Sequence, residues 1–294
     1  MSGFRRLVER LLADSDIRIG GDRPWDVRIH DDRLYRRVLA TGTLGLGEAY
    51  VDGWWDCDAL DQMIDRAQRA DVAGALRSPM NVARVAEAKL RNQQTRRRSF
   101  EVGERHYDIG NDLYERMLDP RMVYSCAYWR SADDLAAAQE AKLELVARKL
   151  RLEPGMRVLD IGCGWGGAAQ YMAEHHGCEV VGITVSAEQA ALARERCADL
   201  PVEILVQDYR ELDERFDRVY SIGMFEHVGV KNYPTYMDVA RRCLGAPGDL
   251  MLLHTIGGLR SRGTTDPWFE RYIFPNSMLP SAAQITRAAE GRRV

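Results

Sequence analysis

Residues 157–167 read Arg-Val-Leu-Asp-Ile-Gly-Cys-Gly-Trp-Gly-Gly, a short apolar strand that runs into a glycine-rich turn. Glycines let the backbone approach a ligand closely, and a helix beginning near Ala168 would offer that ligand unpaired N–H groups and a partial positive charge. Gly162, Gly164 and Gly167 also fit the dinucleotide pattern G-x-G-x-x-G. The turn alone therefore leaves open a dinucleotide site, another nucleotide-type site and a purely structural turn.

The acidic residues near this turn favour S-adenosylmethionine over NAD. A dinucleotide site needs an acid about 20 residues further on, at the end of the second strand. Here that strand ends at Thr184 without an acid. Asp160 instead comes before the first glycine, where a carboxylate could hold a positively charged part of a ligand. S-adenosylmethionine carries such a charge.

Downstream of the turn, apolar strands alternate with helices. Strands and helices of this length predict a parallel, doubly wound sheet, which binds ligands beyond the carboxyl ends of its strands. The predicted strands are 157–161, 179–184, 202–207, 216–222 and 249–256, and the predicted helices are 168–176, 187–198 and 233–244. Residues of interest fall at the strand ends, and they are Gly162, Thr184, Asp208, Glu226 and His254.

Composition argues against several classes of protein. The 294 residues carry a net charge of −3, so nothing overall suggests nucleic-acid binding. No run of about 18 apolar residues exists, and residues 1–13 lack the pattern of a secretory signal. The six cysteines show no CxxC pairing, which is typical of reduced thiols in a cytosolic protein. His175, His176 and Cys178 are too crowded in sequence to favour a zinc site, so no metal is expected.

The N-terminal part predicts a small separate domain at residues 1–90. Residues 4–12 have an amphipathic pattern, which fits a helix docked on its own domain or one lying on a membrane surface. Short alternating segments at 17–37 indicate a partly β unit. Glycines and aromatics at 42–56 indicate tight turns and close packing, or an apolar ligand surface, and residues 58–90 read as helical.

A polar, basic stretch separates this part from the rest of the chain. Residues 91–99 have no apolar periodicity and are interpreted as a linker, either solvated or touching anionic lipid. Residues 100–294 then make up the second domain, in which a helix is predicted at 135–150 before the strands begin.

Seven stretches together resemble the cyclopropane-fatty-acyl-phospholipid synthases, S-adenosylmethionine-dependent enzymes that methylenate cis double bonds in membrane lipids. They are GTLGLGEAYVDGWWDCD (42–58), HYDIGNDLYERMLDPRMVYSCAYW (106–129), VLDIGCGWGG (158–167), GITVSAEQ (182–189), QDYREL (207–212), FDRVYSIGMFEHVG (216–229) and FERYIFPNSMLPS (269–281). VLDIGCGWGG is shared with many methyltransferases, whereas YSCAYW, FEHVG and FPN-x-x-LPS are much more specific. The resemblance covers nearly the whole chain. It implies a doubly wound, Rossmann-like class I methyltransferase sheet (α/β) preceded by a small α+β N-terminal domain with a lipid- or membrane-associated role.

The resemblance also implies a cofactor site. By it, Tyr124 and Ser125 would touch S-adenosylmethionine, and Thr184 with Gln189 would hold the ribose. The remaining candidates follow the strand ends. Gly162 and Gly164 would line the methionine end, and Asp208 with Tyr209 would flank the adenine. Asp160 and Gly166 are further cofactor-binding candidates.

A second implied site is a bicarbonate ion that acts as a base. The resemblance assigns it to Cys126, Glu226, His254, the backbone of Ile256 and a tyrosine further on. Methyl transfer to an alkene leaves a carbocation that must lose a proton, so the reaction needs a positioned base, a dry pocket and π faces. Candidate π faces are Tyr124, Tyr128, Trp129, Trp165, Trp268, Phe269, Tyr272 and Phe274. Taken without the resemblance, Glu226 reads equally well as a capping or surface residue, and His254 as a core histidine.

The expected partner is membrane phospholipid. The protein is expected to be cytoplasmic and to associate peripherally with the inner membrane surface. The first helix and the N-terminal domain would make this transient contact. Residues 257–280 read as a lid or acyl-chain groove. A homodimer is left open. Two alternative functions also remain: methylation of the same alkene without ring closure, and an inactive lipid- or cofactor-binding remnant. The resemblance implies further strands and a tyrosine beyond Val294, so the 294-residue chain is expected to be C-terminally truncated and inactive, or unstable alone.

Overall fold

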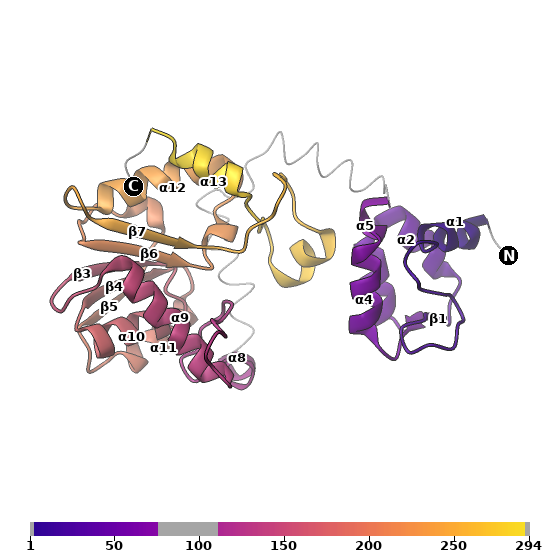
Figure 1. Cartoon of the computed structure of the whole chain (residues 1–294), viewed down its shortest axis with the longest axis horizontal. Helices are drawn as coiled ribbons and strands as arrows, with labels where there is room; N and C mark the ends of the chain where they lie inside the picture. Colours follow the sequence, from indigo (N-terminus) through magenta and orange to yellow (C-terminus); the bar gives the residue numbers. More distant parts are fainter. Residues whose placement is uncertain (1–2, 76–110, 292–294) are drawn as a thin grey trace. The chain divides into compact units, whose positions relative to one another are not determined.

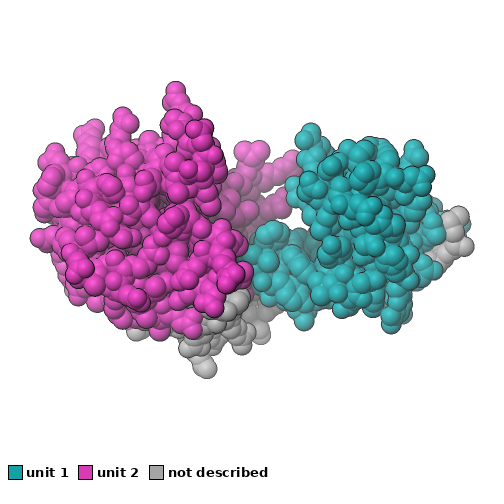
Figure 2. All heavy atoms as spheres, turned by 90° about the horizontal axis from the view of Figure 1, so that it is seen from below, with its two compact units in different colours: residues 1–91, 264–274 teal, residues 92–263, 275–294 magenta. Residues whose placement is uncertain are grey.

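The computed structural model describes residues 3–75 and 111–291 of the chain. The chain divides into two compact units, one formed by residues 1–91 and 264–274, the other by residues 92–263 and 275–294 (Figure 2). The N-terminal unit thus includes 264–274, a segment that the sequence assigned to the second domain. The predicted linker at 91–99, and the part of the predicted helix beyond residue 75, lie outside the described residues.

The larger unit is built on a parallel sheet of five strands, in the order β5-β4-β3-β6-β7 (Figure 1). In chain order its elements are α8 (Asn111–Met117), α9 (Leu135–Leu150), β3 (Arg157–Ile161), α10 (Gly167–His176), β4 (Glu179–Thr184), α11 (Ala187–Arg196), β5 (Val202–Val206), β6 (Arg218–Ile222), α12 (Tyr233–Cys243), β7 (Leu250–His254) and α13 (Ala282–Ala289). Short 3-10 turns lie at Tyr209–Glu211, Phe225–His227 and Val230–Asn232. The predicted α/β class and the alternation of strands and helices are confirmed.

Helices cover both faces of this sheet, as its apolar strands require. On one face, Leu159 and Ile183 pack in a cluster with Tyr236 of α12 and Ala288 of α13. On the other face, Val158 of β3 belongs to a cluster that includes residues of α9 and α10. Because alternate residues of a strand point to opposite faces, Asp160 lies on the same side of β3 as Val158. The acid just before the glycine turn is therefore fixed by strand register.

Local caps explain where the helices begin. The Asp134 carboxylate accepts a hydrogen bond from the Ala137 N–H at 2.8 Å, which starts α9. The Ser186 hydroxyl does the same for the Gln189 N–H at 3.2 Å, which starts α11. Such caps satisfy N–H groups that have no partner inside the helix. Helix α9 ends at Leu150, because the next residue, Arg151, has a left-handed conformation that stops the helix before Pro154.

The N-terminal unit is small and mostly helical. Its described elements are α1 (Gly3–Leu11), β1 (Arg28–Ile29), α2 (Arg33–Thr41), α3 (Thr43–Val51), β2 (Trp55–Asp56), α4 (Leu60–Arg69), α5 (Val72–Ala75) and the π-helix η4 (Phe269–Ile273). Two sequence expectations are wrong here. Residues 33–37 belong to helix α2 rather than to a β segment, and most of 42–56 is helix α3 rather than a series of turns.

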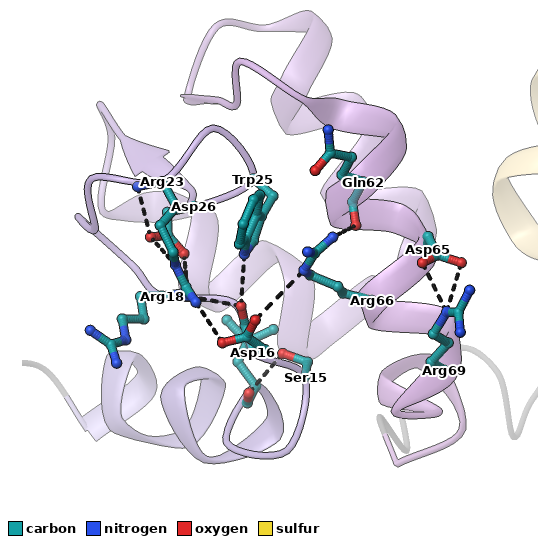
Figure 3. A network of polar contacts seen from close by, with 11 residues as sticks. Ser15, Asp16, Arg18, Arg23, Trp25, Asp26, Gln62, Asp65, Arg66 and Arg69 are labelled. Carbon is teal, nitrogen blue, oxygen red and sulfur yellow. Dashed lines mark hydrogen bonds and ion pairs between the residues drawn. The ribbon is translucent and has the colours of Figure 1, made fainter.

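A polar network ties the loop after α1 to helix α4 (Figure 3). The carboxylate of Asp26, which is 1% exposed, accepts hydrogen bonds from the Arg18 N–H at 2.8 Å and from the Arg23 side chain. The Trp25 indole N–H donates to the Asp16 carbonyl at 3.0 Å, and the Arg66 guanidinium of α4 stacks 3.8 Å from the centre of the Trp25 ring. The network stabilises a loop that has little regular structure.

Segment 264–274 is held in the N-terminal unit by contacts with α3. Thr43 donates a hydrogen bond to Asp266 at 2.7 Å, and the Tyr272 hydroxyl donates to Glu48 at 2.9 Å. Between them, a Cβ added at Gly47 would lie 2.3 Å from the Trp268 ring. Glycine at 47 therefore allows the indole to lie directly on the helix backbone.

We expect Gly47→Ala to displace Trp268 and loosen the 264–274 segment, because a Cβ cannot fit at 2.3 Å. Limited proteolysis should show faster cleavage within 264–274, with a fall of about 1–3 kcal/mol in the free energy of unfolding. Gly263→Ala is the matched control, since a Cβ there meets nothing within 4 Å. Equal cleavage rates in the two variants would contradict the packing argument.

Candidate active site

A pocket opens at the carboxyl ends of the central strands β3 and β6. These strands are neighbours in the sheet, but the chain passes from β3 outward to β4 and β5 before it returns to β6. Such a reversal of strand order creates the crevice in which doubly wound sheets bind ligands. The residues lining the pocket include nine of the sequence-derived cofactor candidates: Tyr124, Ser125, Asp160, Gly162, Gly164, Thr184, Gln189, Asp208 and Tyr209.

Gly162, Gly164 and Gly166 of the turn have different surroundings. All three have positive φ, a conformation that favours glycine. A Cβ at Gly164 would meet no atom within 4 Å, and Gly164 faces the pocket. A Cβ at Gly162 would lie 2.7 Å from Met224, and one at Gly166 would lie 3.0 Å from the Cβ of Ala193. Gly166 is absent from the pocket lining, and its contact with α11 gives it a packing role.

Replacing Gly162 by alanine should destabilise the fold by about 2–4 kcal/mol, the sum of left-handed backbone strain and a clash with Met224. Gly155→Ala separates the two contributions, because Gly155 has φ +80° but no atom within 4 Å of an added Cβ. We expect that control to lose only about 1–2 kcal/mol. Urea unfolding of both variants measures the difference. Equal losses would exclude the clash.

Asp160 is a buried carboxyl in the wall of the pocket. Its side chain is 2% exposed, and Oδ2 has no hydrogen-bond partner among the described residues. Burial raises the pKa of Asp160 to about 7, since the charged form is poorly solvated there. A bound cation would favour the charged form. The positively charged portion of S-adenosylmethionine fits this unpartnered oxygen.

Aromatic side chains form one side of the same pocket. Tyr124 and Trp165 both line it, and Tyr114 lies between them with ring centroids 5.5 Å and 4.7 Å away. The Trp165 indole N–H donates to the side-chain oxygen Oδ1 of Asn111, in α8, at 2.9 Å. These π faces are suited to a sulfonium or another cation.

Polar groups from β4 and β5 form the other side. The Thr184 hydroxyl donates to Gln189 Oε1 at 3.0 Å, so the two residues expected at the ribose are already joined. Asp208 is 1% exposed, and its two oxygens accept from the Arg210 N–H and the Arg210 guanidinium. Tyr209 is buried beside it. Hydroxyl, amide and carboxylate groups of this kind can bind the hydroxyls and amine of a nucleoside.

The four candidate catalytic residues come together as two contacting pairs. Cys126 Sγ lies 3.5 Å from His254 Nε2, and the Ile256 N–H donates to Glu226 Oε1 at 2.7 Å. His254 ends β7, two residues before Ile256, and its carbonyl accepts from the Gly223 N–H at 3.0 Å after β6. The pairs therefore lie at the ends of adjacent strands.

Burial disfavours charge on Glu226 and His254. Glu226 is 6% exposed, and burial raises its pKa above the usual carboxyl value although the Ile256 N–H opposes the shift. Burial also lowers the pKa of His254, and the cationic Lys142 lowers it further. Glu226 Oε2 and His254 Nδ1 have no hydrogen-bond partner among the described residues. Unpartnered polar atoms in a partly buried site are suited to a small polar ligand.

Several lining residues were not expected from the sequence. The pocket is also lined by Met122, Val123, Cys163, Gly167, Ala168, Ile183, Val185, Gln207, Arg210, Ile222, Gly223, Met224 and His227, in addition to Trp165. Most lie within two residues of a predicted ligand residue. Their position near a strand end was therefore the sequence feature that could have predicted them as pocket residues. Of the eight expected π faces, Tyr124 and Trp165 line the pocket. The other six are absent from its lining: Tyr128, Trp129, Trp268, Phe269, Tyr272 and Phe274.

The glycine turn after β3, the buried acid in the pocket wall and the switch in strand order define a class I S-adenosylmethionine-dependent methyltransferase. Comparison with known proteins narrows the class. Residues 94–292 match the sequence profile of the family described as mycolic acid cyclopropane synthetase. The chain belongs to this cyclopropane synthase family of methyltransferases.

Individual relatives agree with the family assignment. A cyclopropane-fatty-acyl-phospholipid synthase of Escherichia coli strain K12 is 52% identical over 286 residues, which cover 97% of this chain and 75% of that protein. The cyclopropane synthase MmaA2 from Mycobacterium tuberculosis superposes with a TM-score of 0.61 at 33% identity, over 65% of this chain and 73% of that one. The mycolic acid cyclopropane synthase CmaA1, in complex with SAH and CTAB, gives 0.60 at 36% identity over the same shares.

Proposed function

We propose that this enzyme transfers the methyl group of S-adenosylmethionine to a cis double bond in an acyl chain of a phospholipid, and that proton loss then closes a cyclopropane ring. The observation that carries the proposal is a pair of contacts at the ends of β6 and β7, that of Cys126 with His254 and that of the Ile256 N–H with Glu226. A methyltransferase acting on an alkene needs a base as well as a methyl donor. The Escherichia coli relative carries the name of this activity.

S-adenosylmethionine would supply an electrophilic methyl group on a sulfonium centre. For it, Asp160 would hold the cationic portion, Gly164 would leave room for it, and Thr184 with Gln189 would bind the ribose. Tyr124 and Trp165 would offer π faces to positive charge in the ligand. Apolar walls around the pocket would keep water from a reactive carbocation.

For the base, we propose a bicarbonate ion held by Cys126, Glu226, His254 and the Ile256 N–H. Bicarbonate would supply an oxygen that accepts the proton lost on ring closure. The raised pKa of Glu226 favours a protonated carboxyl, which can donate a hydrogen bond to an anion instead of repelling it. The carboxyl oxygen Oε2 that lacks a partner supports this role.

We propose that the N-terminal unit makes a reversible contact with the cytoplasmic surface of the inner membrane. Within the described residues, no helix is both long and apolar enough to cross a bilayer. Apolar side chains are exposed on α1, at Phe4 and Leu7, and at the end of α3, at Tyr50 and Val51. Exposed apolar side chains of this kind can insert at a lipid headgroup boundary.

The test uses vesicles of a phospholipid with one cis double bond, S-adenosylmethionine with a CD₃ methyl group, and mass spectrometry of the lipid. Loss of unsaturation with two deuterium atoms retained supports ring closure. Retention of three deuterium atoms indicates a methyl branch and contradicts it. The protein is assayed beside a sample that contains no protein. The absence of labelled lipid from the sample with the protein would overturn the proposal.

A further inference from the structure

Lys142 is a buried lysine beside the candidate active site. It lies on α9, is 4% exposed, and its Nζ donates a hydrogen bond to the Ser125 hydroxyl at 2.8 Å. Among residues 3–75 and 111–291, no carboxylate oxygen lies within the 4.0 Å limit of an ion pair with Nζ. Buried lysines are rare unless they are paired, so this ammonium group requires another explanation.

The groups around Lys142 come from three elements. Its own helix provides Gln139, whose amide nitrogen donates to the carbonyls of Val123 and Ser125 at 3.0 Å and 2.8 Å. The loop before α9 provides Cys126 and Asp119, and both favour the charged form of Lys142. Both carboxylate oxygens of Asp119 already accept hydrogen bonds, one from the Val123 N–H and the other from the Arg121 N–H.

Strand β7 provides the third neighbour, His254. Burial lowers the pKa of His254, and the positive charge of Lys142 lowers it further. The positive charge of Lys149, in the last turn of α9, also lowers the pKa of His254, but by less. Cys126, which touches His254 at 3.5 Å, favours the charged lysine. The loop containing Ser125 and Cys126 thus lies between the ammonium group and the candidate base site.

We propose that Lys142 is a positioning residue that makes this site attractive to a small oxyanion. It fixes Ser125 and the adjoining Cys126 through its hydrogen bond and supplies the positive charge that a bound anion needs. The inference rests on the proposed function, in which the anion is bicarbonate. It explains how an anion can bind beside Glu226 and His254, since burial favours the neutral forms of both groups.

The test measures bicarbonate binding by calorimetry, in protein saturated with S-adenosylhomocysteine. Three variants are compared: Lys142→Met, which removes the charge, Lys142→Arg, which keeps it, and Arg148→Met, which removes an exposed charge from the same helix. We expect Lys142→Met to weaken bicarbonate binding by about tenfold or more, and the other two to stay within about threefold. Affinity for S-adenosylhomocysteine should stay within about threefold in Lys142→Arg and Arg148→Met. In Lys142→Met it should fall less than bicarbonate affinity does, because the variant frees Ser125 in the pocket wall but the ligand does not use the charge.

A pH series and a histidine titration add readouts that a purely structural role would not move. Burial lowers the pKa of Lys142 to about 8, so bicarbonate affinity should fall as pH rises through 8, and Lys142→Arg should abolish this fall. Nuclear magnetic resonance should show a higher pKa for His254 in Lys142→Met, because a repelling charge has gone.

Three outcomes would overturn the inference. Unchanged bicarbonate affinity in Lys142→Met would refute a role of the lysine charge in anion binding, but it would not contradict the proposed function. Equal losses of bicarbonate and S-adenosylhomocysteine affinity, with a His254 pKa that does not move, indicate a structural lysine only. An unsubstituted protein that binds S-adenosylhomocysteine but no bicarbonate overturns both the inference and the bicarbonate assignment.

Discussion

Glu226→Gln should lower turnover by about 10²–10⁴-fold, the range associated with loss of acid–base catalysis. The amide keeps the size of the carboxyl group and can still accept a hydrogen bond from the Ile256 N–H, which is 2.7 Å from Oε1. It cannot exchange a proton with a bound anion. Turnover is measured from labelled lipid, and S-adenosylhomocysteine affinity is measured on the same samples.

The affinity for S-adenosylhomocysteine should change by less than about threefold, because Glu226 lies outside the pocket lining. Glu203→Gln on the exposed side of β5 is the control for loss of a carboxylate and should leave turnover unchanged. A Glu226→Gln enzyme with the turnover of the unsubstituted enzyme would refute a role for Glu226 at the base site.

Asp160→Asn should weaken S-adenosylmethionine binding by about 10–100-fold, since it removes a buried negative charge expected to face a cationic ligand. Calorimetry in two buffers with different ionisation enthalpies measures the affinity and the protons exchanged. Because the pKa of Asp160 is about 7 without a ligand, binding of a cation near neutral pH should release part of a proton. The variant should release none from this position.

The same carboxyl should also shape stability against pH. Its pKa rises from 3.8 in the unfolded chain to about 7 in the folded one, so the folded state binds the proton more tightly. Stability from this group is therefore present at low pH and is lost as pH rises from about 4 to 7, by on the order of 2–4 kcal/mol. Asp160→Asn should flatten that decline in urea unfolding measured across the range. An unchanged slope would contradict a buried, ligand-free Asp160.

The methyltransferase sheet was largely predictable from sequence, because each of its strands is a short apolar run and its helices have local caps. The predicted strand 157–161 and helix 135–150 match β3 and α9 at both ends. The N-terminal unit was harder because its glycines serve packing. A Cβ at Gly45 would lie 2.7 Å from the Arg37 carbonyl, and one at Gly47 would meet Trp268. A local pattern shows glycines at these positions but not the partners that require them.

Some residues of the candidate site were predictable from the sequence, and others were not. Residues at strand ends were predictable, because parallel strands bring their carboxyl ends to one edge. The 3.5 Å contact of Cys126 with His254 joins positions 128 apart in sequence, and no periodicity predicts it. Only the resemblance to a family placed those two residues together. Lys142 carries no motif at all, and its importance follows from burial in the folded chain.

All six cysteines lie within the described residues, and five of them are buried. Cys126 alone is exposed, and it contacts His254 in the candidate active site. In the folded protein a thiol-alkylating reagent should therefore react at one position, and the rate of that reaction reports on the occupancy of the site. The protein thus carries a natural attachment point for a spectroscopic probe, and no engineered cysteine is needed.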